Sequence, residues 1–479
     1  MKRAAFGLAL ALGAAFHASA AVAVTAAAAV AVAAASDAAA PAVAYTERRL
    51  PNGLQVITVP SRTSPSVSVQ VWYHVGAKDD PPGRSGFAHL FEHLMFKSTQ
   101  NLRAEQFDRL TDDVGGANNA FTTDDVTAYQ NIVPSHHLET LLWAEAERMA
   151  NLQVRQASFE SEREVVKQEY RQRVLTPPYG RFALAIASLP YQVHAYRRPL
   201  IGSMADLDAA RLDDVSAFHA AHYRPDNATL VVAGDFDAAQ LDSWVERYFA
   251  PVPRPPTARL RADDSSATGA TSAAGSPDNS PATRTQEPAW PRDRRLALTG
   301  PQVALPAVAI AWLAPPLTSL DVAALRVAAA LLGGGESARL NQALVYQRQL
   351  AAQASFDADL RTGPGLLIAS ATAASGQALA AVEAGLLAEV LRLTRQPVAA
   401  AELAKVKRQL LTDALLARQT PEGLGSAVAE AAVLHGDAAH VNVSLDALQR
   451  VSGADVRRVL RRYLVGPHKV TIRYTQAPP

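Results

Sequence analysis

The stretch FAHLFEHLMF, residues 87–96, places two histidines and a glutamate inside an otherwise apolar segment that reads as a helix. Residues i and i+4 of an α-helix share a face, so His89 and His93 point the same way and Glu92 borders that face. The apolar neighbours favour burial, and burying three polar groups costs several kcal/mol unless partners satisfy them. The segment therefore predicts a helix that carries a buried polar site.

A metal ion would satisfy these groups. Two imidazoles one helical turn apart can bind one Zn²⁺, and the adjacent carboxylate can take a proton from an attacking water. The order HxxEH is the inverse of the zinc-binding HExxH pattern. The alternative is a pair of ordinary core histidines, each with one hydrogen bond. With 12 histidines in the chain, a chance HxxEH is expected on the order of 0.01 times per chain.

A catalytic zinc usually has three protein ligands, so the third ligand is sought on another element. The helical stretch FESEREVVKQEYR, residues 159–171, offers four glutamates. Glu162 and Glu169 are two turns apart and share a face, about 10 Å apart along the axis, so both cannot bind one ion. Spacing alone leaves open which is the ligand and which assists. The four candidates are Glu160, Glu162, Glu164 and Glu169.

The composition is that of a globular protein with more than one domain. The 479 residues exceed one ordinary core, with 49% hydrophobic and 19% charged residues. A net charge of +1, from 46 basic and 45 acidic residues, leaves no strongly basic field to attract nucleic acid. The absence of cysteine excludes disulfides and thiolate metal sites.

The N-terminus predicts export. Lys2 and Arg3 precede the apolar run 4–16 and the small-residue sequence Ala18-Ser19-Ala20, so residues 1–20 are expected to be a signal peptide. Its removal would change the net charge to 1 − 2 = −1. Residues 21–44 form an Ala-rich segment, expected to be a flexible mature N-terminus, with an uncleaved anchor as the alternative. We expect a periplasmic protein without stable membrane insertion.

Two similar halves are expected on either side of a linker. Residues 45–250 run through strands and helices, residues 251–290 are rich in Pro, Ser, Thr and Ala, and residues 291–479 repeat the earlier order. Each half mixes a sheet with helices on one face, which defines an α+β fold built from two α/β rolls. The first half is the predicted catalytic domain, and the second half lacks any HxxEH.

The residues resemble the pitrilysin/insulinase metallopeptidases, most specifically at GFAHLFEHLMFKST, residues 86–99. The resemblance extends from about Tyr45 over nearly the whole chain, through GGANNAFTTDDVTAY, EREVVKQEYR, HYRPDNATLVVAGDF and LLGGGESARL. It implies one zinc ion per chain, and it chooses between the two carboxylates on the second helix. By position, it implies zinc ligation by His89, His93 and Glu169, a general base at Glu92 and a helper carboxylate at Glu162.

The resemblance also implies a strand that binds the substrate. Asn119, Ala120 and Phe121 match the strand along which the peptide adds as a further strand, mainly through backbone hydrogen bonds. Asn119 would contact the peptide near the cleaved bond, and Phe121 would line a side-chain pocket. The alternative is an ordinary edge strand beside a polar turn.

One motif departs from the family pattern. Members of this kind carry an arginine and a tyrosine seven residues apart, in a pattern like LRxxxGLxY, to stabilise the oxyanion. The matching stretch LVYQRQLAA, residues 344–352, has Val345 and Ala352 at those positions, and Tyr346 and Arg348 fall at the wrong spacing. The resemblance then implies a zinc-bearing subunit that pairs with a homologous Arg/Tyr subunit as a heterodimer, or else forms a homodimer.

Two functions follow from these features. The first is a zinc-dependent endopeptidase subunit that hydrolyses peptides through a metal-activated water, with Glu92 as the base. The second is a non-catalytic peptide-binding or assembly subunit with a structural zinc. The glutamate within HxxEH favours the first, because a structural site needs no base.

Overall fold

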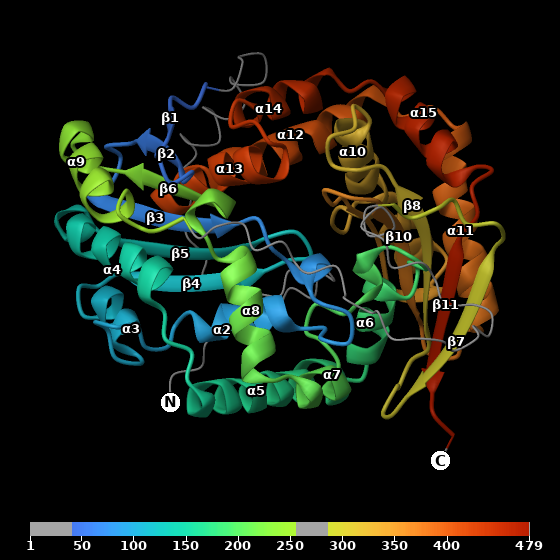
Figure 1. Cartoon of the computed structure of the whole chain (residues 1–479). Coiled ribbons are helices and arrows are strands. Elements are labelled where there is room, and N and C mark those ends of the chain that lie inside the picture. Colours follow the sequence, from blue (N-terminus) through green and yellow to red (C-terminus); the bar gives the residue numbers. More distant parts are fainter. Residues whose placement is uncertain (1–40, 255–285, 479) are drawn as a thin grey trace, which may run out of the picture.

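The computed structural model describes residues 41–254 and 286–478 (Figure 1). The predicted signal peptide, most of the Ala-rich segment and the central part of the predicted linker lie outside these residues. Among the helices of the described ranges, none combines the length and the apolar character that crossing a bilayer requires.

The first half contains a six-stranded sheet in the order β1-β2-β6-β3-β5-β4. Strands β2 and β6 are parallel, and the other neighbours are antiparallel. Strand β4 therefore lies at one edge, where its outer backbone groups face away from the sheet. The strands are β1 (Thr46–Arg49), β2 (Gln55–Pro60), β3 (Ser66–Tyr73), β4 (Ala117–Thr122), β5 (Thr127–Pro134) and β6 (Ala228–Gly234).

Helices of the first half pack on one face of this sheet around a continuous apolar core. The predicted second helix is longer than one regular helix, since α5 continues into the π-helical turn η3 (Arg171–Leu175). The short turn η1 (Ala77–Asp79) leads into α2, and η4 (Ala195–Arg197) lies beside η1. The α-helices are α2 (Phe87–Leu94), α3 (Gln106–Asp112), α4 (Leu138–Asn151), α5 (Gln156–Tyr170), α6 (Gly180–Ser188), α7 (Met204–Ala209), α8 (Leu212–His222) and α9 (Ala238–Phe249).

The second half repeats this topology. Its strand order, β7-β11-β8-β10-β9, matches β2-β6-β3-β5-β4 strand for strand, including the parallel pair. The expectation of an α+β fold with two similar halves is confirmed. The elements are β7 (Arg294–Gly300), β8 (Ala307–Ala314), α10 (Val322–Gly333), η7 (Asn341–Gln347), β9 (Ala351–Asp359), β10 (Gly365–Ala373), α11 (Leu379–Arg395), α12 (Ala400–Ala417), α13 (Pro421–Leu434), α14 (His440–Arg450), α15 (Gly453–Leu464) and β11 (Val470–Gln476).

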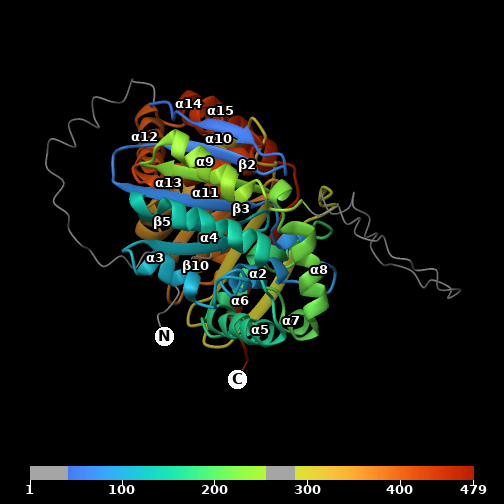
Figure 2. The same ribbon diagram turned by 60° about the vertical axis from the view of Figure 1, so that its left-hand side comes forward.

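Each half also lends a helix to the sheet of the other half, as Figures 1 and 2 show. Helix α13 buries Val428 and Ala432 against Trp72 and Val231, on the face of the first sheet that its own helices leave open. In return, α6 belongs to an apolar cluster with strands β8, β10 and β11 of the second sheet. Both faces of each sheet are therefore covered, and the two halves share their cores.

The last described residues of the predicted linker are also packed against the first half. The Glu287 carboxylate accepts hydrogen bonds from the backbone N–H groups of residues 192–194 at 2.7–2.9 Å. Trp290 is 4% exposed and joins the cluster around α6. These contacts hold the start of the second half against the first half.

The exchanged helices predict that the two halves unfold together. Phe182 of α6 stacks on Tyr474 of β11 with ring centroids 5.3 Å apart. Phe182→Ala should lower the free energy of unfolding by about 3–5 kcal/mol, because it leaves a cavity between the halves. The exposed control Val443→Ala should change it by less than about 0.5 kcal/mol. Urea denaturation should give one shifted transition; two transitions, of which only one moves, would contradict shared cores.

Candidate metal centre

The helix that carries HxxEH begins at a tightly built turn. Gly86, at φ 94°, precedes α2, and the Asp80 carboxylate accepts hydrogen bonds from the N–H groups of Gly86 and Ala88 at 2.7 and 2.9 Å. These bonds satisfy donors that the first turn of a helix leaves open. A side chain at Gly86 would lie 2.9 Å from the Cα of Gly202, so the adjoining loop fits only against glycine. The start of α2 is therefore fixed from two sides.

Helix α5 places Glu169 beside the two histidines. We call His89, His93 and Glu169 together the cage. One oxygen of Glu169, Oε2, lies 3.4 Å from Nε2 of His89 and 3.5 Å from Nε2 of His93. Within the described ranges, these three residues are the group whose potential ligand atoms come together, all within 4.8 Å of one another. The structure thus brings Glu169, and not Glu162, to both histidines.

The cage fits a zinc ion in its spacing and its chemistry. Neighbouring ligands of a tetrahedral zinc, with bonds of about 2.0–2.2 Å, lie roughly 3.3–3.5 Å apart. His89 is 3% exposed and the Glu169 side chain is 12% exposed, so the cage is largely shielded from water. Burial lowers the pKa of His89 to about 3, so this imidazole is neutral, as a metal ligand must be.

Two carboxylates, those of Glu162 and Glu169, lie beside His93. Burial alone would lower the pKa of His93. The hydrogen bonds with Glu162 and Glu169 outweigh burial and raise this pKa to about 9. Without a metal ion, a proton on His93 therefore compensates the two carboxylates. A cation in the cage would take over this role, and zinc binding would release the proton.

Glu162 holds His93 from the side opposite the cage. Its Oε2 atom lies 3.3 Å from Nδ1 of His93, and its Oε1 atom lies 2.7 Å from Nζ of Lys97. Burial favours the neutral carboxyl, but the bonds to His93 and Lys97 outweigh it and lower the pKa of Glu162. Such a carboxylate orients the ring of a metal-binding histidine and raises its basicity.

Glu92 is buried beside the cage, with 3% of its surface exposed. Burial raises the pKa of Glu92, and a hydrogen bond from Thr122 at the end of β4 and the nearby His93 oppose this shift. A raised pKa suits a carboxylate that must take a proton near neutral pH and give it back. Glu92 thus lies near the end of the expected substrate strand.

The three expected substrate residues lie on the edge strand β4 but do not share one face. Ala120 is 1% exposed and belongs to the core that contains α2. Asn119 is exposed, and Phe121 packs edge to face on Trp72, with centroids 5.3 Å apart, in the cluster that contains α13. Backbone pairing at this edge is open to a peptide, and the roles of the three side chains stay predictions.

The backbone conformation supports the alignment of LVYQRQLAA, residues 344–352, with the family pattern LRxxxGLxY. The glycine of LRxxxGLxY falls on Gln349, and Gln349 has a positive φ of 50°, a conformation that favours glycine. Val345 then lies in η7 against the core of the second half, and Ala352 is exposed on the edge strand β9. Neither side chain can donate a hydrogen bond to an oxyanion.

Two cations of this site are absent from the sequence-based prediction. Lys97 pairs with Glu162, as described above, and Nε of Arg173 lies 2.9 Å from Oε1 of Glu169. Arg173 thus binds the Glu169 oxygen that faces away from the histidines. The i, i+4 spacing from Glu169 could have suggested this pair, but Arg173 lies in the π-helical turn η3, which shifts the helical spacing.

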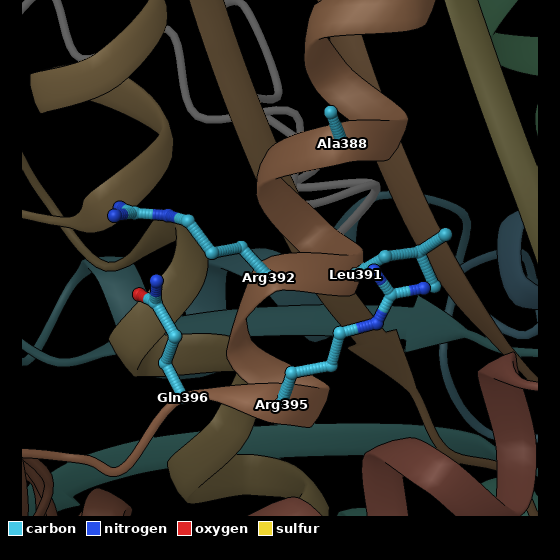
Figure 3. Close-up of a pocket in the computed structure, with 5 residues that line it drawn as sticks. All are labelled: Ala388, Leu391, Arg392, Arg395 and Gln396. Atoms are coloured by element: carbon cyan, nitrogen blue, oxygen red, sulfur yellow. The ribbon is translucent and has the colours of Figure 1, made fainter.

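A separate depression lies on α11 in the second half (Figure 3). None of its lining residues belongs to the metal cage or to β4. Arg392, one of them, pairs with Glu389 at 2.6 Å. The depression is lined by Ala388, Leu391, Arg392, Arg395 and Gln396.

Comparison with known proteins identifies the family. Residues 55–202 match the family described as Insulinase (Peptidase family M16), and residues 209–410 match the Peptidase M16 inactive domain. Together the two matches cover more than half of the chain. The chain therefore belongs to the pitrilysin/insulinase family, in a two-domain form.

Its relatives are named as zinc proteases. The chain is 33% identical over 306 residues to "Zinc protease PqqE" of Helicobacter pylori, and this match covers 64% of each protein. It is 26% identical over 198 residues to "Uncharacterized zinc protease YmxG" of Bacillus subtilis, covering 41% of this chain and 48% of that protein. The chain thus matches less than two thirds of the length of these curated relatives.

Solved structures share the fold across nearly the whole chain. A protease from Helicobacter pylori superposes with a TM-score of 0.81 at 26% identity, covering 90% of this chain and 99% of that one. The periplasmic protease PqqL from Escherichia coli gives a TM-score of 0.70 at 17% identity, covering 92% and 48%. The second likeness concerns the fold alone.

The two carboxylates of α5 should differ in their effect on zinc. Glu169→Gln should weaken zinc binding strongly, because it removes a negative ligand from the cage. Glu162→Gln should retain zinc, with an affinity lower by about 10–100-fold, because it acts only through His93. Metal analysis of both variants at matched zinc concentrations checks this. Full zinc in Glu169→Gln and none in Glu162→Gln would reverse the assignment.

Proposed function

We propose that this chain is a zinc-dependent endopeptidase subunit. The observation that carries the proposal is the approach of Glu169 to both His89 and His93 at 3.4 and 3.5 Å, next to the buried Glu92. The names of the relatives agree with it. His89, His93 and Glu169 would hold one Zn²⁺ per chain.

The chain's own residues would divide the work of hydrolysis. A zinc ion in the cage would supply Lewis acidity and make a water molecule a better nucleophile at neutral pH. Glu92 takes the proton of the attacking water and then passes it to the leaving amine. Glu162, held by Lys97, keeps the His93 ring in place, and Arg173 holds the outer oxygen of Glu169.

The peptide would bind along β4 as an additional strand. This edge pairs with β5 on one side only, so its outer N–H and C=O groups can bond to an extended backbone. Recognition through the backbone places few demands on peptide sequence. Thr122, at the end of the strand, would set the distance between the bound peptide and Glu92.

A non-catalytic role is the second candidate. The match of the second half to a domain described as inactive and the replacement of the Arg/Tyr pair by Val345 and Ala352 favour it. The buried Glu92 favours catalysis, because a carboxylate excluded from water costs free energy that a structural zinc site would not require.

A partner and a location complete the proposal. We propose that a homologous subunit with the Arg/Tyr motif forms a heterodimer with this chain, with a homodimer as the alternative. The basic residues and apolar run at the N-terminus support export to the periplasm.

Glu92→Gln should separate catalysis from metal binding. The variant should fold and bind zinc, while hydrolysis of peptides should fall by about 10²–10⁴-fold, because a carboxamide cannot accept the proton. Glu164→Gln, on the exposed side of α5, is the matched control. Peptidase assays with parallel metal analysis check this. Unchanged hydrolysis by Glu92→Gln would contradict the proposed mechanism. Chelators should inactivate the native protein reversibly.

The missing Arg/Tyr pair predicts a dependence on the partner. The purified chain should bind zinc but cleave peptides slowly, because losing one preorganised oxyanion donor costs about 10²–10³-fold in rate. Adding a homologous subunit with LRxxxGLxY should restore that factor and shift the mass to that of a heterodimer. Peptidase assays and light scattering would test this together. Full activity of the chain alone would contradict it.

A further inference from the structure

The second half contacts the first half at a buried polar cluster beside the end of β4. We define the latch as the β9–β10 turn residues Arg361 and Thr362 together with Asp124, Asp125 and Tyr196 of the first half. Asp124 and Asp125 lie in the β4–β5 turn, directly after the proposed substrate strand. The latch therefore connects the two halves at the end of β4.

Hydrogen bonds to Asp125 come from both halves. Its carboxylate accepts bonds from the Thr362 N–H at 3.0 Å and from the Thr362 hydroxyl, and a further bond from the Tyr196 hydroxyl at 2.7 Å. Lys78 contributes an ion pair at 2.9 Å. Asp125 is only 6% exposed, so this arrangement excludes water from a charged group.

Arg361 forms the second part of the latch. Its guanidinium lies 3.0 Å from the Asp124 carboxylate and 2.6 Å from Asp359, and its side chain is 10% exposed. It also stacks over the Tyr196 ring at 4.8 Å. The second half thus supplies a cation to Asp124, whose side chain is 20% exposed.

The latch is also in contact with the turn η1, which leads into α2. The N–H groups of Ala77 and Lys78, in the turn before α2, donate to the carbonyls of Thr123 and Asp124 at 3.1 Å. A side chain at Gly76 would lie 2.4 Å from the Asp124 backbone, so the two turns are in direct contact. This segment leads to Asp80, which fixes the start of α2.

We infer that Arg361 and Thr362 are positioning residues, by which the second half sets the substrate strand against the zinc helix. This inference rests on the proposed function. Thr122, which lies at the end of β4 near Glu92, is two residues from Asp124. Displacing the β4–β5 turn would therefore move both the peptide edge and the support of the base, while the cage of His89, His93 and Glu169 stays intact. The half without HxxEH thus gains a role in substrate binding.

The test uses the full chain with Glu92→Gln, so that peptide binding is measured without turnover. Arg361→Met removes the cation, and Thr362→Val removes one hydroxyl and keeps the backbone donor. Arg339→Met is the control, because Arg339 pairs with Glu402 within the second half, at 2.7 Å. Fluorescence anisotropy with a labelled extended peptide gives the affinity, metal analysis gives the zinc content, and hydrogen exchange reports on β4.

Both latch variants should bind the peptide about tenfold more weakly than the control, with the same zinc content and faster amide exchange in β4. Arg361→Lys should recover part of the affinity, because it restores the charge. Affinity equal to that of the control in both latch variants would overturn the inference alone. Loss of peptide binding already in the Glu92→Gln parent would overturn the proposed function and this inference with it.

Discussion

The burial of two imidazoles and a carboxylate on one short helix is the constraint on which the structure depends. His89, Glu92 and His93 are excluded from water by the apolar residues around them, and such groups are stable only with partners of matching charge and geometry. Glu169 lies beside both histidines, and Glu162 contacts His93. Helix α5 meets this requirement by placing both carboxylates against the histidines.

The repeated half shows what the fold becomes without that requirement. Helix α10 follows β8 as α2 follows β3, but its sequence VAALRVAAALLG packs as an ordinary apolar helix. The second half has instead become a support. It lends α13 to the first sheet, takes α6 onto its own, and joins the end of β4 through Arg361 and Thr362. Duplication with exchange of helices makes one half depend on the other for its core.

Much of the fold was predictable because the sequence patterns are local. The apolar segment around HxxEH predicts α2. Local patterns could not choose Glu169 over Glu162, because both lie on one face of α5, and the resemblance was needed. The exchange of α6 and α13 could not be predicted, since an apolar helix face does not say which sheet it covers. The pairing of Arg173 with Glu169 has the i, i+4 spacing of an ordinary helical ion pair, so the sequence did carry a signal for it.

The central claim is that α2 and α5 together bind zinc through two histidines and one carboxylate. X-ray absorption spectroscopy at the zinc edge of the loaded protein, compared with Glu169→Gln, tests it most directly. The account predicts two imidazoles and carboxylate or water oxygens at about 2.0–2.2 Å, with a changed spectrum in the variant. An identical spectrum in both proteins would contradict it, because the zinc would then lie elsewhere, for example at the stacked pair His435 and His440.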